Sequence, residues 1–162
     1  MYGQWRIADF PLNWDSGIVN VDSEGRAVSP LKPEITGYHE DFSIVWSPDG
    51  RWIAYHSHRC PTPVGSYYAE GVTDDIWLRA AEGGPEIRIT DFGHEVGMPD
   101  WAPDGRRMAF CTEGKDGSSS RPWIITIDPN TGRPESITPL EIRGIEGDVR
   151  IAAWSPKKRR LP

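Results

Sequence analysis

Two histidine–glutamate pairs occupy matching positions in the sequence. His39 and Glu40 come seven and six residues before one Trp, and His94 and Glu95 come at the same distances before another. Imidazole and carboxylate groups are suitable ligands for a borderline divalent metal ion, and converging carboxylates attract cationic ligands. The repetition suggests a ligand-binding site made of all four residues, with His39 and His94 as metal ligands. No other cofactor is predicted.

A structural interpretation of the same pairs is open, and we favour it. His and Glu are ordinary polar loop residues, which cap a strand or hydrogen-bond within their own loop. The third Trp of this kind is preceded at the same distances by Gly147 and Asp148. The pairing is therefore not continued in the last repeat.

A long loop offers a second candidate for ligand contact. Tyr67 and Tyr68 lie in residues 60–73, which are longer than the corresponding stretch at 115–121. Aromatic residues on loops often anchor a partner, so we include both as candidate ligand-binding residues. Alternatively, the two tyrosines only pack the loop onto its sheet.

The stretch HSHRC would place His56, His58 and Cys60 on one face of an extended strand. That spacing could bind a transition metal. However, Cys111 takes the place of His56 in the next repeat, which favours ordinary sheet surface. The two cysteines of the chain do not form a disulfide framework and are expected to be thiols.

These residues are positioned by a repeat. WSPDG begins at Trp46, WAPDG at Trp101 and WSPKK at Trp154, so the spacings are 55 and 53 residues. Pro presets φ and Gly accepts positive φ, so Ser/Ala-Pro-Asp-Gly indicates a tight turn. Apolar stretches before and after the turn predict a β-hairpin.

Two more strands follow each hairpin. The stretches DDIWLRAAEGG and RPWIITIDPNTG predict a third strand, and PEIRIT and RPESIT predict a short fourth strand. No segment sustains helical periodicity. The sequence is therefore all-β, and each repeat is four antiparallel strands with the period of a propeller blade.

The W-S-P-D-G turn, the following I-A-F-like strand, D-I-W in the third strand and R-I-T in the fourth resemble the TolB-like β-propeller family. The resemblance covers nearly the whole chain, and it implies a WD-like repeat propeller of six blades. It implies much less about function, because propellers host many activities and many binding roles.

The strand count predicts three blades in a single half-propeller domain, residues 1–162. Blade 1 combines strands in 3–32 with a C-terminal strand at 149–156, blade 2 spans about 42–92, and blade 3 about 97–140. Three blades are too few to close a ring. We therefore expect a homodimer in which the last strand of each chain completes the first blade of its partner. The alternative is that the chain is a fragment of a longer propeller.

Composition excludes some classes of partner. The net charge of −6 argues against nucleic acid, and no apolar stretch is long enough to span a membrane. No signal peptide is recognisable, so we expect a cytoplasmic protein as the sequence is written, or a periplasmic or secreted one if a leader was removed. No G-x-S-x-G elbow, phosphate-binding loop or dinucleotide motif occurs.

The function expected from these features is a non-enzymatic propeller scaffold that binds a protein or small ligand on its loop face. The alternative is a metal-dependent carbohydrate-active enzyme, which would resemble the oligogalacturonate lyases and use a divalent metal held by histidines. Whether the chain is an enzyme stays open, with the scaffold preferred.

Overall fold

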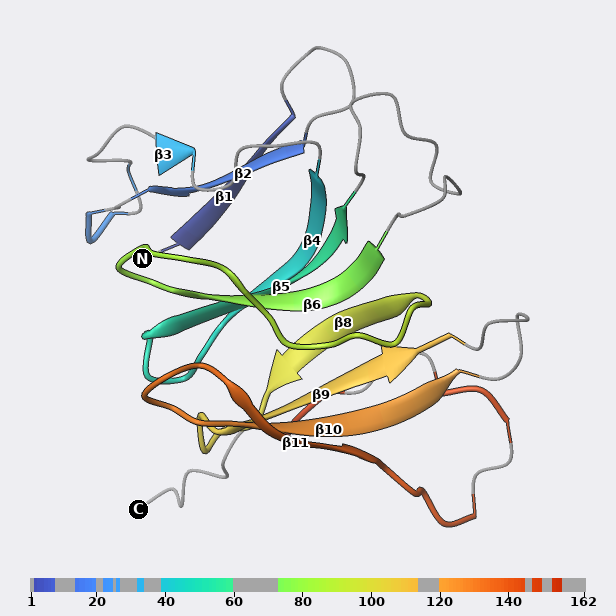
Figure 1. The fold of residues 1–162 in the computed structure, drawn as a ribbon. Helices are drawn as coiled ribbons and strands as arrows, with labels where there is room; N and C mark the ends of the chain where they lie inside the picture. Colours follow the sequence, from blue (N-terminus) through green and yellow to red (C-terminus); the bar gives the residue numbers. More distant parts are fainter. Residues whose placement is uncertain are drawn as a thin grey trace. The chain divides into compact units, whose positions relative to one another are not determined.

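Strands joined by turns and irregular segments make up the chain that the computed structural model describes (Figure 1). The described residues are 2–7, 14–19, 22–24, 26, 32–33, 39–59, 73–113, 120–144, 147–149 and 153–155. These ranges contain no helix that could cross a membrane. Residues 1–41 with 58–73 form one compact unit, and residues 42–57 with 74–162 form another.

The first sheet has three antiparallel strands in the order β1 (Tyr2–Ile7), β2 (Trp14–Val19) and β3 (Lys32–Pro33). β1 pairs with β2 along its whole length, and two residues of β2 pair with β3. β1 is thus an edge strand among the described strands of this sheet. Apart from Tyr2, it lies within residues 3–32, where the repeat predicts strands of blade 1.

The other two sheets have four antiparallel strands each, and their spatial order follows the chain order. One contains β4 (His39–Trp46), β5 (Trp52–Arg59), β6 (Thr73–Ala80) and β7 (Ile87–Arg88); the other contains β8 (Val96–Trp101), β9 (Arg107–Thr112), β10 (Arg121–Ile127) and β11 (Pro134–Pro139). The prediction of an all-β fold with four antiparallel strands in each complete repeat is confirmed.

The Pro-Asp-Gly turns are closed by their aspartates. Asp49 accepts hydrogen bonds from the Ser47 hydroxyl at 2.6 Å and from the backbone N–H and Nε of Arg51. Gly50 has a φ of 72°, which suits glycine. The Ser47 hydroxyl and the Arg51 contacts lower the pKa of Asp49 to about 2. Asp104 closes the second turn in a similar way.

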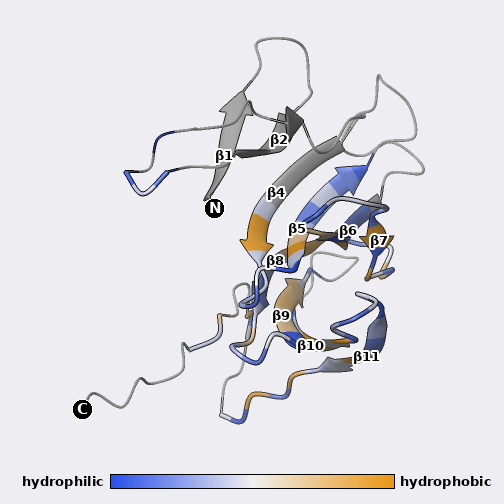
Figure 2. Ribbon diagram, turned by 90° about the vertical axis from the view of Figure 1, so that its left-hand side faces the viewer, coloured by the Kyte–Doolittle hydropathy of each residue, from blue (hydrophilic) through white to orange (hydrophobic). Residues whose placement is uncertain are grey.

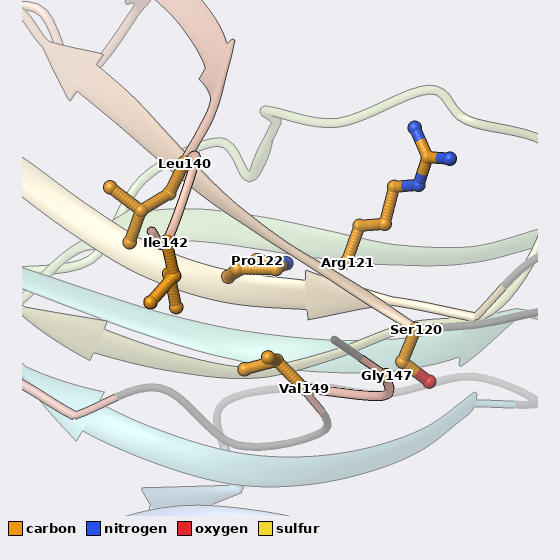
Figure 3. Close-up of a pocket in the computed structure, with 7 residues that line it drawn as sticks. All are labelled: Ser120, Arg121, Pro122, Leu140, Ile142, Gly147 and Val149. Carbon is orange, nitrogen blue, oxygen red and sulfur yellow. The ribbon is translucent and has the colours of Figure 1, made fainter. Parts of the chain in front are cut away.

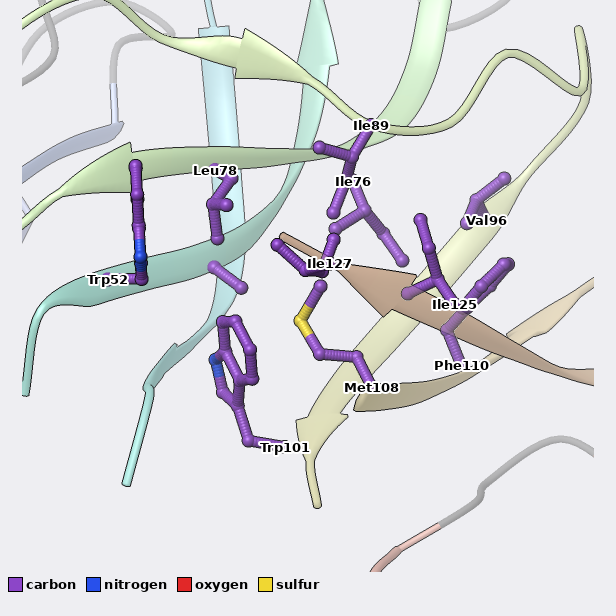
Figure 4. Packing of buried hydrophobic residues seen from close by; sticks show 11 residues of the cluster. Trp52, Ile76, Leu78, Ile89, Val96, Trp101, Met108, Phe110, Ile125 and Ile127 are labelled. Atoms are coloured by element: carbon purple, nitrogen blue, oxygen red, sulfur yellow. The ribbon is translucent and has the colours of Figure 1, made fainter. Parts of the chain in front are cut away.

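The hydrophobic core lies between the two four-stranded sheets, as Figure 4 shows. It consists of Trp52, Ala54, Ile76, Leu78 and Ile89 from the β4–β7 repeat, and of Val96, Trp101, Met108, Phe110, Ile125 and Ile127 from the β8–β11 repeat. Burying each large side chain contributes about 1.5–3 kcal/mol. Sheet-on-sheet packing of adjacent blades is thus the main source of stability.

The D-I-W and R-I-T motifs meet through a buried carboxylate. Asp75 is 1% exposed and accepts hydrogen bonds from the Thr90 hydroxyl and from Nε of Arg88, both at 2.8 Å. The N–H of Ile76 donates to the Thr90 hydroxyl at 2.9 Å. Both motifs therefore fix the fourth strand of the repeat onto the third.

The first strand of each repeat contains the same backbone irregularity. Ser43 and Met98 each lie three residues before the repeat Trp, with φ of 52° and 55°. Among the described residues they are the only ones other than glycine with positive φ. In β8 the pairing with β9 shifts register between Gly97 and Asp100. A bulge of this kind bends the strand and redirects a side chain.

Candidate functional site

The connection between β7 and β8 lies at one end of the sheets, beside the end of β9. Val96 pairs with Thr112, and the N–H of Glu113 donates to the carbonyl of Glu95 at 3.0 Å. We call this end, where β5 and β9 finish and β6 and β10 begin, the loop face. In Figure 2, β5 changes from apolar to polar towards this end.

A histidine–aspartate pair lies on the loop face. His56, on β5, contacts the carboxylate of Asp74, on β6, through its Nε2 atom. Their side chains are 13% and 18% exposed. Because a carboxylate only accepts hydrogen bonds, Nε2 carries the proton in this contact. Two regular strands thus position the pair.

Glu95 interacts with the same pair from the neighbouring sheet. Loss of water around its carboxyl group raises the pKa of Glu95, and the carboxylates of Glu113 and Asp74 raise it further, while His56 lowers it. A hydrogen bond with Glu113 also favours the protonated form. Asp74, Glu113 and His56 thus all influence Glu95; we call these four residues the loop-face cluster.

The carboxyl groups of the loop-face cluster are of the kind that attract cations. Carboxyl groups that repel one another retain a proton to higher pH, and a bound cation relieves the same repulsion. No group of three or more His, Cys, Asp or Glu positioned to hold a metal ion is found among the described residues. An ammonium or guanidinium group is a cation of another kind, which carboxylates bind through hydrogen bonds.

His94 is held in one orientation beside the cluster residue Glu95. Its Nδ1 atom lies 2.8 Å from the carbonyl oxygen of Phe92, and its ring meets the Phe92 ring edge to face at 5.6 Å. Phe92 itself packs on Phe110 and Trp123. Since a carbonyl can only accept, Nδ1 of His94 donates the hydrogen bond in this contact. The contact with Phe92 and the ring stacking together fix the position of the His94 ring.

The structure describes only part of the site expected from the sequence. His94 and Glu95 lie in the predicted connection, whereas His39 and Glu40 are the first two residues of β4 rather than loop residues. The side chains of His39 and Glu40, and all of Tyr67, Tyr68 and Cys60, lie outside the described residues. His58 is buried, with 6% exposure.

Asp74 and Glu113 were missed by sequence reasoning. Each is a charged residue that borders the loop between the second and third strands of a repeat. Asp74 comes just after this loop in one repeat, and Glu113 comes just before it in the next. Charged residues at such loop borders were the available signal. Their approach to His56 and Glu95 depends on strand register, which composition does not reveal.

Comparison with known proteins adds the family context. No protein-family model matches the chain. Dipeptidyl-peptidase 5 of Porphyromonas gingivalis is 29% identical over 136 residues, 82% of this chain and 18% of that protein. Tol-Pal system protein TolB of Alcanivorax borkumensis is 30% identical over 96 residues, 59% of this chain and 19% of that protein.

A solved structure described as a TolB from Agrobacterium tumefaciens superposes with a TM-score of 0.59 at 20% identity, over 96% of this chain and 50% of that one. The resemblance to the TolB-like β-propellers is thereby confirmed. The chain nevertheless spans less than a fifth of the two curated relatives. In the TolB-like fold, the loop-face cluster lies where strands of two adjacent blades end.

Proposed function

We propose that this chain is a non-enzymatic β-propeller scaffold that binds a protein or small ligand on its loop face and works as a homodimer. Two copies would supply six blades.

The observation that carries the binding role is the loop-face cluster. The carboxylates of Asp74 and Glu113 both act on the carboxyl group of Glu95, in a chain whose net charge is −6. We propose a cationic ligand: a peptide or protein that presents an amino or guanidinium group. The names of the two relatives, a dipeptidyl-peptidase and a Tol-Pal system protein, agree with a peptide or protein ligand.

The loop-face cluster is held by regular strands, which supports a role in ligand binding. His56 and Asp74 belong to β5 and β6, and Glu113 directly follows β9. Groups held on strands lose little freedom when a ligand binds, so a larger part of the interaction energy contributes to affinity.

The test is a titration of isotope-labelled protein with the dipeptide Gly-Arg, followed by NMR, with Gly-Glu as the acidic counterpart. Both dipeptides are acetylated at the N-terminus and amidated at the C-terminus, so that only their side chains carry charge. We expect Gly-Arg to shift amide signals of residues 94–96 and 112–113, and Gly-Glu to leave them in place. The double variant Glu95→Gln, Glu113→Gln should weaken Gly-Arg binding about five- to tenfold, since each exposed charge pair contributes up to about 1 kcal/mol.

Glu82→Gln is the matched control, because Glu82 is exposed in the turn after β6, at the opposite end of that strand. It removes the same charge and should leave binding unchanged. Equal shifts with both dipeptides, or an equal loss of affinity in the control and the double variant, would show that the cluster does not select cations.

A further inference from the structure

The outer face of the β8–β11 sheet is equivalent to the face of the β4–β7 sheet that is covered within this chain. The N–H of Ala81 donates to the carbonyl of Arg51, and the N–H of Ile127 donates to that of Arg106, which aligns β5–β6 with β9–β10. In the β4–β7 sheet, the face that includes Trp52, Ala54, Ile76 and Leu78 is covered by the β8–β11 sheet. The aligned positions one repeat later are Arg107, Ala109, Pro122 and Ile124.

That aligned face is hollow and partly apolar. A pocket of about 240 Å³ opens on it, and Figure 3 shows the side chains that line it. The lining residues are Ser120, Arg121, Pro122, Leu140, Ile142, Gly147 and Val149. Leu140 and Ile142 are 39% and 38% exposed, and with Met98 they are the exposed large hydrophobic residues of the described chain.

The segment 153–155 lies against the same sheet. The N–H of Trp154 donates to the carboxylate of Asp100 at 2.6 Å, and the Arg107 guanidinium lies 5.0 Å from the centre of the Trp154 ring. Trp154 is equivalent in the repeat to Trp101, and Arg107 is equivalent to Trp52. Trp101 and Trp52 are both members of the core between the sheets. Trp154 thus marks where the next sheet would begin on this face.

We infer that this face docks the first sheet, β1–β3, of a second copy of the chain, and that the segment around Trp154 adds to the edge strand β1 of that copy. The described strands leave one edge of β1 without a neighbour, whereas each complete sheet begins with one more strand there. A sheet of this protein is what covers the equivalent face within the chain. The inference rests on the homodimer proposed above and names its interface.

Two identical joints of this kind would close a ring by two-fold symmetry. The outer face of the β8–β11 sheet in each copy would pack on the β1–β3 sheet of the other copy, as a two-fold interface requires. Edge strands expose unpaired N–H and C=O groups. Addition of a strand at β1 would pair these groups, while the first sheet of the same copy covers the outer face of the β8–β11 sheet.

Sedimentation of the wild type and of the double variant Leu140→Glu, Ile142→Glu tests the inference. We expect the wild type to have the mass of two chains and the variant to dissociate, with a dissociation constant raised roughly a hundredfold or more. Met98→Glu is the control, because it places the same charge at an exposed apolar residue of β8, at the other edge of the sheet from β11. The control should remain a dimer.

The outcomes separate the two proposals. A wild type with the mass of one chain overturns the homodimer and this interface together, and leaves loop-face binding to its own titration. A double variant that remains a dimer overturns only the interface. If the double variant does not fold, amide exchange of the wild type decides: protection of residues 120–124 and 140–144 must rise with protein concentration, and constant protection overturns the inference.

Discussion

The indole N–H of Trp52 donates a hydrogen bond to the carbonyl oxygen of Pro129 at 3.0 Å, joining the second strand of one blade to the last turn of the next. The same turn contains Gly132, with a φ of 70°. A Cβ at this glycine would lie 2.6 Å from Trp52 and 3.0 Å from Leu78. The two blades therefore meet at a point where a methyl group does not fit.

Gly132→Ala should lower the free energy of unfolding by about 2–4 kcal/mol, from steric overlap and from left-handed strain together. Urea denaturation followed by Trp fluorescence measures it. Gly50→Ala is the matched control, because Gly50 has a similar φ and open space around it. It should cost only the strain, about 1–2 kcal/mol. Equal losses would show that blade contact at Gly132 is unimportant.

The turn aspartate makes stability sensitive to acid. The pKa of Asp49 is about 2 in the folded chain and 3.8 in the absence of its partners. Its contribution is therefore complete above about pH 4 and is lost as the pH falls towards 2. In Ser47→Ala, the pKa of Asp49 should rise, because the strongest cause of the shift is removed, and acid unfolding should begin at higher pH. Urea melts between pH 2 and 7 check this; superimposable profiles would contradict it.

Glu95 should behave in the opposite sense. Its pKa lies above the ordinary value of 4.5, so the folded state binds the proton more strongly and stability falls as the pH rises through that range. Carbon-13 NMR of the side-chain carboxyl measures the pKa directly. We expect Glu113→Gln to lower the pKa of Glu95, and Glu82→Gln to leave it at the wild-type value. An unchanged pKa in Glu113→Gln would mean that the two carboxyl groups are independent.

The repeated bulge predicts a stabilising substitution. Met98 is 49% exposed and has positive φ, so Met98→Gly removes strain with little loss of burial. We expect a gain of about 0.5–1 kcal/mol, and a loss of about 1 kcal/mol for Met98→Val, whose branched side chain tolerates that backbone poorly. Ser43→Gly should act like Met98→Gly. Denaturant melts measure all three, and a loss in both glycine variants would show that the bulge is not strained.

The repeat predicted the sheets because turn chemistry and apolar alternation are local properties of sequence. The Trp spacing of 55 residues aligns the first two strands of the two complete repeats, and even the positive φ of Ser43 and Met98 recurs at that interval. Local signals of this kind need no knowledge of how the sheets pack.

The site depended on information that is not local. His56 meets Asp74 across a long loop, and Glu95 meets Glu113 through a bulged pairing of β8 with β9. A shift of one residue in either pairing would turn a side chain to the opposite sheet face. The His–Glu repetition therefore identified His94 and Glu95, while their interaction partners required the register.

The exchange of Trp52 for Arg107 at equivalent positions makes the two blades non-interchangeable. A core of near-identical repeats risks out-of-order pairing while the chain folds, because any blade face could accept any other. Here Trp52 fits against Gly132 where the two complete sheets pack, whereas at the equivalent position of the next sheet the Arg107 guanidinium lies over the Trp154 ring. The two equivalent faces thus present different side chains to the sheet that packs on them, and this difference favours one order of blades as the chain folds.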